Sequence, residues 1–141
     1  VVTHQSGASQ IDALRANYEA AGVQADCTPF IEDTATAFAD ADIIVCRAGA
    51  STVTEIAAVG AAAIFVPFPS AVDDHQTTNA QFLVDAGGGW LVQQRDLTPE
   101  GLSQMLLKLE RPALVDIALK AKNMQKINAT REVVTACEEL A

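Results

Sequence analysis

A glycine and three hydroxyl residues stand close together after an apolar run. Residues 46–55 read CRAGASTVTE and follow DIIV, a run typical of a strand buried on both faces. A helix is expected over 52–59, so the preceding turn is predicted to expose free amide groups at a helix N-terminus. Such amides bind anions, with help from about half a positive charge of the helix dipole. The predicted anion-binding segment is Gly49, Ala50, Ser51, Thr52 and Val53.

The carboxylate of Glu55 has two interpretations. It could accept hydrogen bonds from the two hydroxyls of a ribose, as the acidic residue of a dinucleotide-binding fold does. Thr52 and Glu55 also have the spacing of a capping box, worth about 1 kcal/mol to the helix. Capping boxes are common, so the spacing alone leaves both roles open.

A second polar segment, DDHQTTNA over 73–80, follows the apolar run AIFVPF. The carboxyl ends of parallel strands share one edge of a sheet, so this segment is expected beside the first. His75, Gln76 and Asn79 could bind sugar hydroxyls there. Asp73 or Asp74 as an N-cap, followed by a solvated polar face, explains the pattern about as well.

Other reactive side chains favour structural roles. Asp40 and Asp42 resemble a metal-binding pair but precede their strand, at the wrong edge of a parallel sheet, so neither a metal nor a cofactor is predicted. His4, with Gln5 beside it, is expected to be a hydrogen-bonded structural residue, although both could border the site. We expect Cys46 in the core, and Arg47 paired with a carboxylate, with a phosphate contact as the less favoured alternative.

Helical and strand patterns alternate along most of the chain. This order predicts an α/β fold, a Rossmann-like parallel sheet with helices on both faces. Helices are expected over 10–21, about 32–41, 52–59, 74–86, 99–110, 112–127 and 130–140, and strands over the first five residues, 23–27, 42–46, 61–68 and 90–93. No linker or repeat divides the 141 residues, so a single domain is expected.

The charge excludes several classes of partner. The formal net charge is −9, and the nine Lys and Arg residues form no cluster, which argues against nucleic acid or an anionic membrane surface. Three widely spaced cysteines and the lack of an apolar run of about 20 residues favour a reduced, cytoplasmic protein. The first residue is not Met, and we expect a chain truncated at its N-terminus.

Five segments carry a resemblance to a known family: HQSG at 4–7, FIED at 30–33, ADIIVCRAGASTVTEIAAVG at 41–60, AIFVPFP at 63–69 and DDHQTTNA at 73–80. In order and spacing they resemble the C-terminal half of the MurG family. These transferases add N-acetylglucosamine to lipid I and so make lipid II for peptidoglycan. The resemblance implies a two-domain GT-B glycosyltransferase, of which residues 1–141 are the donor-binding domain and the acceptor domain is absent.

The resemblance also implies a role for individual residues in binding UDP-N-acetylglucosamine. The main chain of Ile31 would meet the uracil, Ala50 to Thr52 the diphosphate, Glu55 the ribose, and Gln76, with His75 and Asn79 nearby, the sugar. The implied set of binding residues is Ile31, Gly49, Ala50, Ser51, Thr52, Val53, Thr54, Glu55, His75, Gln76 and Asn79. Pro69 to Val72 depart from the family pattern, and a Gly-rich segment that opens the family's domain is missing.

The family's reaction inverts the anomeric carbon without a protein-bound metal. The helix N-terminus would stabilise charge on the departing UDP, while a base in the absent domain activates the acceptor. No catalytic residue is therefore expected in this chain, which should be inactive alone. Lipid I and the cytoplasmic face of the inner membrane would be contacted only through the absent domain. Residues after about 97 are expected to be scaffold.

Two alternatives remain open from the sequence. One is a natural half of a split transferase, or a related UDP-sugar epimerase. The other is a non-enzymatic nucleotide-binding module that uses the same sheet edge for regulation or assembly.

Overall fold

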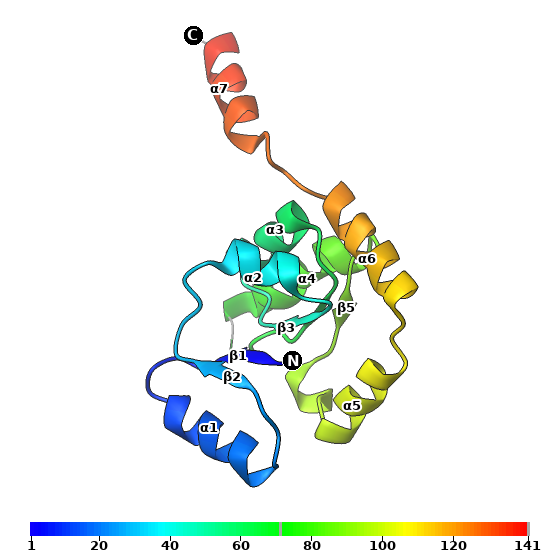
Figure 1. The fold of residues 1–141 in the computed structure, drawn as a ribbon. Helices are drawn as coiled ribbons and strands as arrows, with labels where there is room; N and C mark the ends of the chain where they lie inside the picture. The colour runs from blue at the N-terminus through cyan, green and yellow to red at the C-terminus, as the bar shows by residue number, and fades with distance from the viewer. Residues whose placement is uncertain (71, 141) are drawn as a thin grey trace. The chain divides into compact units, whose positions relative to one another are not determined.

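The computed structural model describes residues 1–70 and 72–140, in two compact units, Val1–Ala37 and Phe38–Ala141 (Figure 1). The first unit contains a parallel pair of strands, β1 (Thr3–Gln5) and β2 (Asp26–Thr28), joined by the helix α1 (Ile11–Ala20). His4 lies opposite Cys27 in this pair. The helix α2 (Thr34–Asp40) begins in the first unit and ends in the second.

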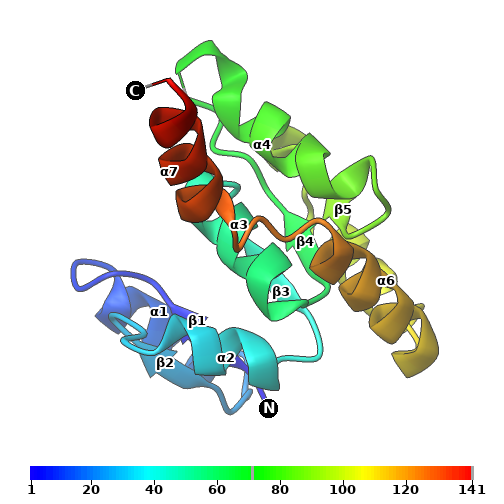
Figure 2. The same ribbon diagram turned by 90° about the horizontal axis from the view of Figure 1, so that it is seen from above.

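The second unit contains a three-stranded parallel sheet in the order β3-β4-β5. The strand β3 (Ile44–Cys46) leads through α3 (Ala50–Val59) to β4 (Ala63–Phe65), which leads through α4 (His75–Val84) to β5 (Trp90–Leu91). The helices α3 and α4 lie side by side along the sheet (Figures 1 and 2). Both helices therefore begin at the carboxyl edge of the sheet, where parallel folds bind ligands.

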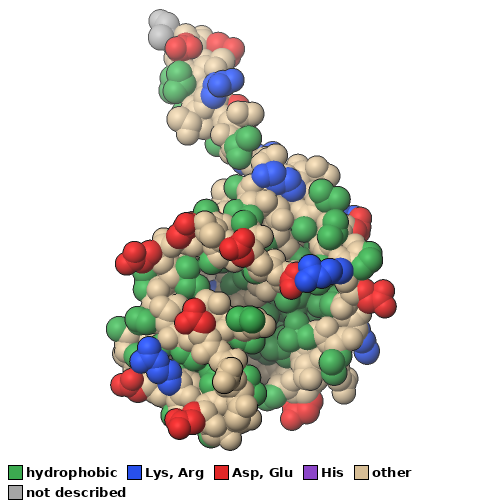
Figure 3. Space-filling view, viewed as in Figure 1, with side chains coloured by type: hydrophobic (Ala, Val, Ile, Leu, Met, Phe, Trp, Pro, Cys, Tyr) green, Lys and Arg blue, Asp and Glu red, His purple; other side chains and the backbone are tan. Residues whose placement is uncertain are grey.

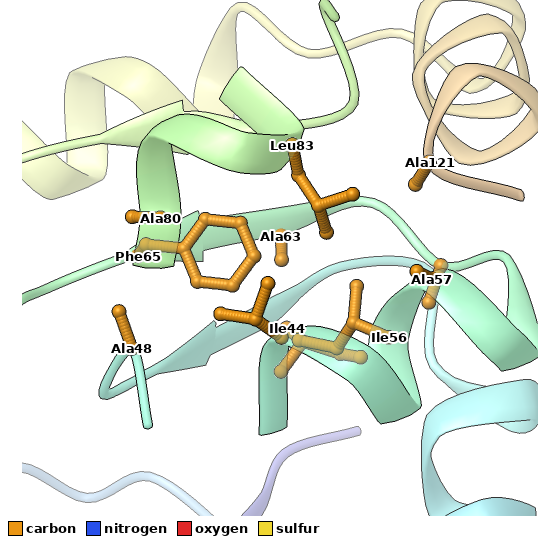
Figure 4. Close-up of a cluster of buried hydrophobic side chains, with 11 residues drawn as sticks. Ile44, Ala48, Ile56, Ala57, Ala63, Phe65, Ala80, Leu83 and Ala121 are labelled. Carbon is orange, nitrogen blue, oxygen red and sulfur yellow. The ribbon is translucent and has the colours of Figure 1, made fainter. Parts of the chain in front are cut away.

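The core of the second unit lies between this sheet and its helices. The side chains of Ile56, Phe65 and Leu83 are fully buried and point into the same space (Figure 4). Ala121 from α6 (Arg111–Asn123) completes the cluster, so the C-terminal part of the chain contributes to the core. Burial of such side chains stabilises each by about 1.5–3 kcal/mol relative to exposure.

Two glycines before β5 allow close packing. A Cβ atom at Gly89 would lie 2.8 Å from the carbonyl oxygen of Ala63, and one at Gly88 would lie 2.9 Å from the Cα of Ala121. The triple glycine at 87–89 therefore brings β5 and α6 close to their neighbours, besides ending α4.

The remaining helices follow in sequence. The helix α5 (Pro99–Leu107) has Thr98 as its N-cap, whose hydroxyl accepts a hydrogen bond from the Gly101 amide at 3.0 Å. Every residue of α7 (Ala129–Glu139) is exposed. Two short 3-10 turns, Val72–Asp74 and Gln94–Asp96, precede α4 and α5.

The predicted fold class is confirmed: parallel strands alternate with flanking helices. The hydrogen-bonded ladders form a pair and a triplet of strands. The predicted cap at Thr98 is also confirmed, and most helix boundaries agree to within a few residues. The helix α3 begins two residues before the predicted start, and α6 ends at Asn123 and not at about 127 as predicted.

Candidate functional site

Three residues, 47–49, separate the end of β3 from the start of α3. Gly49 is the N-cap, and the helix begins at Ala50. The first-turn amides of Ala50, Ser51 and Thr52 have no carbonyl one turn earlier to bind, and no side chain caps them. The amide of Val53 instead donates to the Gly49 carbonyl at 3.0 Å. The prediction of a free amide at Val53 is therefore wrong, because the helix starts earlier than its polar pattern suggests.

The capping-box interpretation is also wrong. Thr52 is the third residue of α3 and not its N-cap, and no side-chain capping bond is present. Glu55 lies in the second turn with an exposed side chain, beyond the amides that a capping box would satisfy. The carboxylate of Glu55 is therefore not required to cap the helix.

Gly49 leaves open space at this N-terminus. Its φ of −62° and ψ of 147° suit any residue, so the backbone does not demand glycine. The nearest atom to a Cβ placed there would be the Thr52 Oγ1, at an ordinary 3.8 Å. Neither conformation nor packing explains the glycine, whereas a ligand that approaches the backbone closely would.

The loop before α3 is held by the neighbouring strand and helix. Asn79 Nδ2 donates to the Ala48 carbonyl at 3.1 Å. Arg47 Nη1 donates to the Val66 and Pro67 carbonyls, each at 3.2 Å, and its guanidinium lies 5.5 Å from the centre of the Phe68 ring. The prediction that Arg47 pairs with a carboxylate is therefore wrong, and its cation instead joins the loops after β3 and β4.

The second polar segment begins α4 at the same edge of the sheet, as predicted. Asp74, one of the two residues predicted as N-cap, stands at that position in the left-handed conformation at φ 51°, but its side chain caps no amide and instead accepts a hydrogen bond from the Thr77 hydroxyl at 2.6 Å. Gln76 Oε1 accepts from the Phe68 amide at 2.9 Å, which leaves its NH₂ group for a ligand. His75 is exposed in the first turn.

A hollow of about 300 Å³ lies between α3 and α4. It is lined by four of the predicted binding residues, Ala50, Val53, Thr54 and Asn79. The lining residues are Ala50, Val53, Thr54, Thr78, Asn79, Phe82 and Lys126. The Thr54 hydroxyl donates to the Ala50 carbonyl at 2.8 Å. Toward a ligand, the Thr54 Oγ1 can therefore act only as an acceptor.

Ile31 belongs to the first unit, in the segment after β2. Its amide donates to the side-chain oxygen Oε1 of Gln5 at 2.7 Å. The neighbouring Phe30 ring is 65% exposed and offers an apolar surface that a flat base could cover. His4 Nδ1 lies 3.1 Å from the Tyr18 hydroxyl, as expected for a structural histidine.

The other reactive groups are explained by their surroundings. Cys46 is partly buried and packs against the core cluster, as predicted, and burial raises the pKa of its thiol to about 12. Asp42 forms an ion pair with Arg111 at 2.9 Å. Within residues 1–70 and 72–140, no three His, Cys, Asp or Glu side chains are grouped to hold a metal ion.

Lys and Arg side chains are scattered among Asp and Glu on the face in Figure 3 and form no single basic patch. Among the residues that the structure describes, no Lys or Arg side chain is bonded to the amides at the α3 N-terminus, so main-chain groups alone face an anion there. In the described part of the chain, no helix is long and apolar enough to cross a membrane.

Some contributors were not predicted. The bond between Gln5 and Ile31 joins residues 26 positions apart, and sequence alone gives no sign of it. Lys126 follows α6 and reaches the hollow only because α6 packs on α3. The carbonyl partners of Arg47 lie in a loop that no charge pattern in the sequence marks.

Comparison with known proteins shows a family match and closely similar relatives. Residues 1–137 match the model for the glycosyltransferase family 28 C-terminal domain. A protein of Paracidovorax citrulli is 79% identical over 140 residues, and one of Polaromonas sp. is 76% identical, each over 99% of this chain. Both relatives bear the name UDP-N-acetylglucosamine--N-acetylmuramyl-(pentapeptide) pyrophosphoryl-undecaprenol N-acetylglucosamine transferase.

A solved structure has the same fold. The crystal structure of Acinetobacter baumannii MurG matches with a TM-score of 0.90 and 46% identity over 97% of this chain. The chain spans 39% and 36% of the length of the two relatives and 42% of the crystallised protein. It therefore corresponds to well under half of each of these proteins.

Proposed function

We propose that this chain, which belongs to the glycosyltransferase family 28 C-terminal domain family, binds UDP-N-acetylglucosamine as the donor-binding domain of a transferase. The reaction proposed for the whole protein is transfer of N-acetylglucosamine to lipid I, giving lipid II. The names of the relatives from Paracidovorax and Polaromonas support this donor and this acceptor class. Residues 1–141 would then form the donor half of a GT-B enzyme.

The observation that carries the proposal is the uncapped N-terminus of α3. The amides of Ala50, Ser51 and Thr52 follow directly after the N-cap Gly49, and no atom packs closely against that glycine. The diphosphate is assigned to these amides, where the helix dipole favours negative charge. Glu55 is exposed one turn farther along and is assigned to the ribose hydroxyls.

The remaining donor contacts are proposed separately for each segment. In α4, the free NH₂ group of Gln76 is assigned to the sugar, together with His75 and Asn79. Asn79 already donates to the Ala48 carbonyl, so it also positions the loop that precedes the amides. In the first unit, the main chain of Ile31 is assigned to the uracil.

The proposed chemistry of this half is stabilisation of the leaving group. As the bond from the anomeric carbon to the diphosphate breaks, negative charge grows on the departing UDP. Amides that are already oriented by the helix can stabilise that charge without rearrangement. The base that removes the proton of the acceptor hydroxyl is assigned to the rest of the enzyme, so we expect the 141-residue chain to bind the donor without transferring its sugar.

Contact with lipid I and with the cytoplasmic face of the inner membrane is likewise proposed only for the complete enzyme. Such an enzyme would be a peripheral, cytoplasmic-face protein of bacterial cell-wall synthesis. The scattered cations of this chain offer an anionic membrane no concentrated attraction.

The proposal is tested by titrating ¹⁵N-labelled chain with UDP and with UDP-N-acetylglucosamine. We expect the amide signals of Ala50, Ser51 and Thr52 to shift as the ligand is added. In Glu55→Gln the affinity should fall about 3- to 30-fold, because a hydrogen bond to a charged acceptor is weakened. The free energy of unfolding should stay unchanged, because Glu55 caps nothing.

The matched control is Glu100→Gln, which changes another exposed glutamate, in the first turn of α5. It should leave affinity unchanged. If UDP shifts none of the three amides, the diphosphate site is wrong. If Glu55→Gln alters stability and not affinity, the ribose assignment is wrong.

A further inference from the structure

We propose that the side chain of Gln5 is an internal substitute for the nucleotide base, which it must release before the base can bind. This inference rests on the proposed function, in which the Ile31 main chain receives the uracil. In the ligand-free structure, the Ile31 amide is already bonded to Gln5 Oε1 at 2.7 Å. That amide carries one proton, so a base that accepts from it competes with Gln5.

The chemistry of the two acceptors is closely matched. A glutamine side chain carries a carbonyl oxygen next to an NH₂ group. The edge of uracil likewise carries a carbonyl oxygen next to a ring N–H. Gln5 Oε1 therefore occupies the Ile31 amide with the same kind of acceptor that a uracil carbonyl offers, on a flexible stem that can swing away.

The position of Ile31 does not depend on Gln5 alone. The segment after β2 is tied to the end of β1 by two main-chain hydrogen bonds, from Ser6 to the Thr28 carbonyl at 3.3 Å and from Gly7 to the Pro29 carbonyl at 3.1 Å. The Thr28 hydroxyl also donates to the Phe30 carbonyl at 2.8 Å. Removal of the Gln5 side chain should therefore free the Ile31 amide without releasing the segment.

Replacing the Gln5 bond by a bond to the base should cost little free energy, because Gln5 lies at the surface. Both Gln5 and the Ile31 bond are exposed, so water can satisfy the Gln5 amide once it has moved. Before the base arrives, the bond keeps the Ile31 amide satisfied. The consequence is a site whose affinity for the uridine part of the donor is reduced by the strength of one hydrogen bond.

The test compares Gln5→Ala with the unchanged chain by NMR titration, with UDP and with uridine as ligands. Without ligand, the Ile31 amide of Gln5→Ala should exchange with solvent faster. Affinity for both ligands should rise between about two- and tenfold, the equivalent of one net hydrogen bond. Uridine has no phosphate, so its response isolates the base from the amides of α3.

A second variant separates competition from loop support. Gln5→Glu retains an acceptor and gives it a charge, which strengthens the bond to the Ile31 amide. Its affinity for uridine should therefore fall below that of the unchanged chain. Gln10→Ala is the matched control, since Gln10 lies in the same unit and its side chain caps no helix amide, and it should change neither affinity.

Two results would overturn the inference. If Gln5→Ala binds UDP equally or more weakly while UDP still shifts the amides of α3, Gln5 is only a support, and the proposed function stands. If UDP shifts no amide in the unchanged chain, the proposed function and this inference fail together. The opposed effects expected of the alanine and glutamate variants cannot arise from loop support, since glutamate would support the loop at least as well.

Discussion

The side chain of Asp33 accepts hydrogen bonds at the start of α2, and these bonds shift its pKa. Its Oδ1 accepts from the Thr36 amide at 2.9 Å and its Oδ2 from the Thr36 hydroxyl at 2.7 Å. These bonds, the amide first, lower the pKa of Asp33 below its ordinary 3.8. Because the folded chain favours the carboxylate, Asp33 stabilises the fold above that ordinary pKa, and the contribution is lost as the pH falls through the lowered value.

The first prediction follows from this shift. In Thr36→Val the hydroxyl bond is lost while the amide bond remains, so the pKa of Asp33 should rise partway toward 3.8. A ¹³C-detected titration of the carboxyl group measures it. Asp33→Asn is the control, because its stability should lack this component of acid dependence. An unchanged midpoint in Thr36→Val would show that the hydroxyl contributes nothing.

Gly89 gives a second prediction at the scale of one residue. In Gly89→Ala the new Cβ would lie 2.8 Å from the Ala63 carbonyl oxygen and 3.0 Å from the Phe65 ring. We expect a loss of about 1–3 kcal/mol in the free energy of unfolding, as for other overpacked sites. Urea denaturation measures the loss.

Gly49→Ala is the control for that substitution. Its Cβ would meet nothing closer than 3.8 Å, so the loss should be below about 1 kcal/mol, the scale of a change of N-cap residue. If the two variants prove equally stable, β5 can move away from β4 at little cost.

At the scale of elements, the third prediction concerns the start of α5. The Thr98 hydroxyl accepts from the Gly101 amide, so Thr98→Ala leaves that amide without its cap. The free energy of unfolding should fall by about 1 kcal/mol, measured in urea. Ser103→Ala, an exposed change within the same helix, should stay within about 0.5 kcal/mol. Equal effects would mean that α5 does not unfold with the rest of the protein.

The caps of α5 and α3 also show what the sequence could predict about elements. At Thr98, the proline that follows fixes the first helical residue, so pattern and structure agree. At α3, Thr52 and Glu55 carry a capping pattern inside the helix, while the actual N-cap is a glycine. A local sequence pattern cannot show that hydrogen bonds between residues far apart in the sequence hold the loop before α3. These bonds join Arg47 to the Val66 carbonyl and Asn79 to the Ala48 carbonyl. The order of strands and helices was predictable because it depends on local periodicity alone.

At the scale of the whole molecule, charge and binding site are separate features. The chain has a formal net charge of −9, yet the site proposed for an anion rests on main-chain amides. The sequence predicted this combination because a glycine turn between a strand and a helix is a local feature. It could not predict which amides are free, since that depends on where α3 begins, nor that Gln5 binds the Ile31 amide.

The fourth prediction uses this separation. Lysine-rich phosphate sites lose affinity steeply as salt rises, because counterions compete for the phosphates. Here added salt should mainly screen repulsion between UDP and the acidic chain. Affinity for UDP measured by calorimetry at about 50 and about 200 mM salt should therefore stay constant or rise slightly. A tenfold fall would mean that cationic side chains hold the phosphates.

The helix that carries the proposed diphosphate site is anchored near both ends. Asn79 of α4 holds the loop at its beginning, and Lys122 of α6 donates its ammonium hydrogen to the Ala58 carbonyl near its last turn. Lys122 also covers Gly60, the residue that ends the helix. The conformational entropy of the α3 N-terminus is therefore lost when the protein folds, and binding of the nucleotide does not require a further loss there. The α3 amides should therefore receive the nucleotide without rearrangement, and any motion that accompanies binding is expected in segments other than α3.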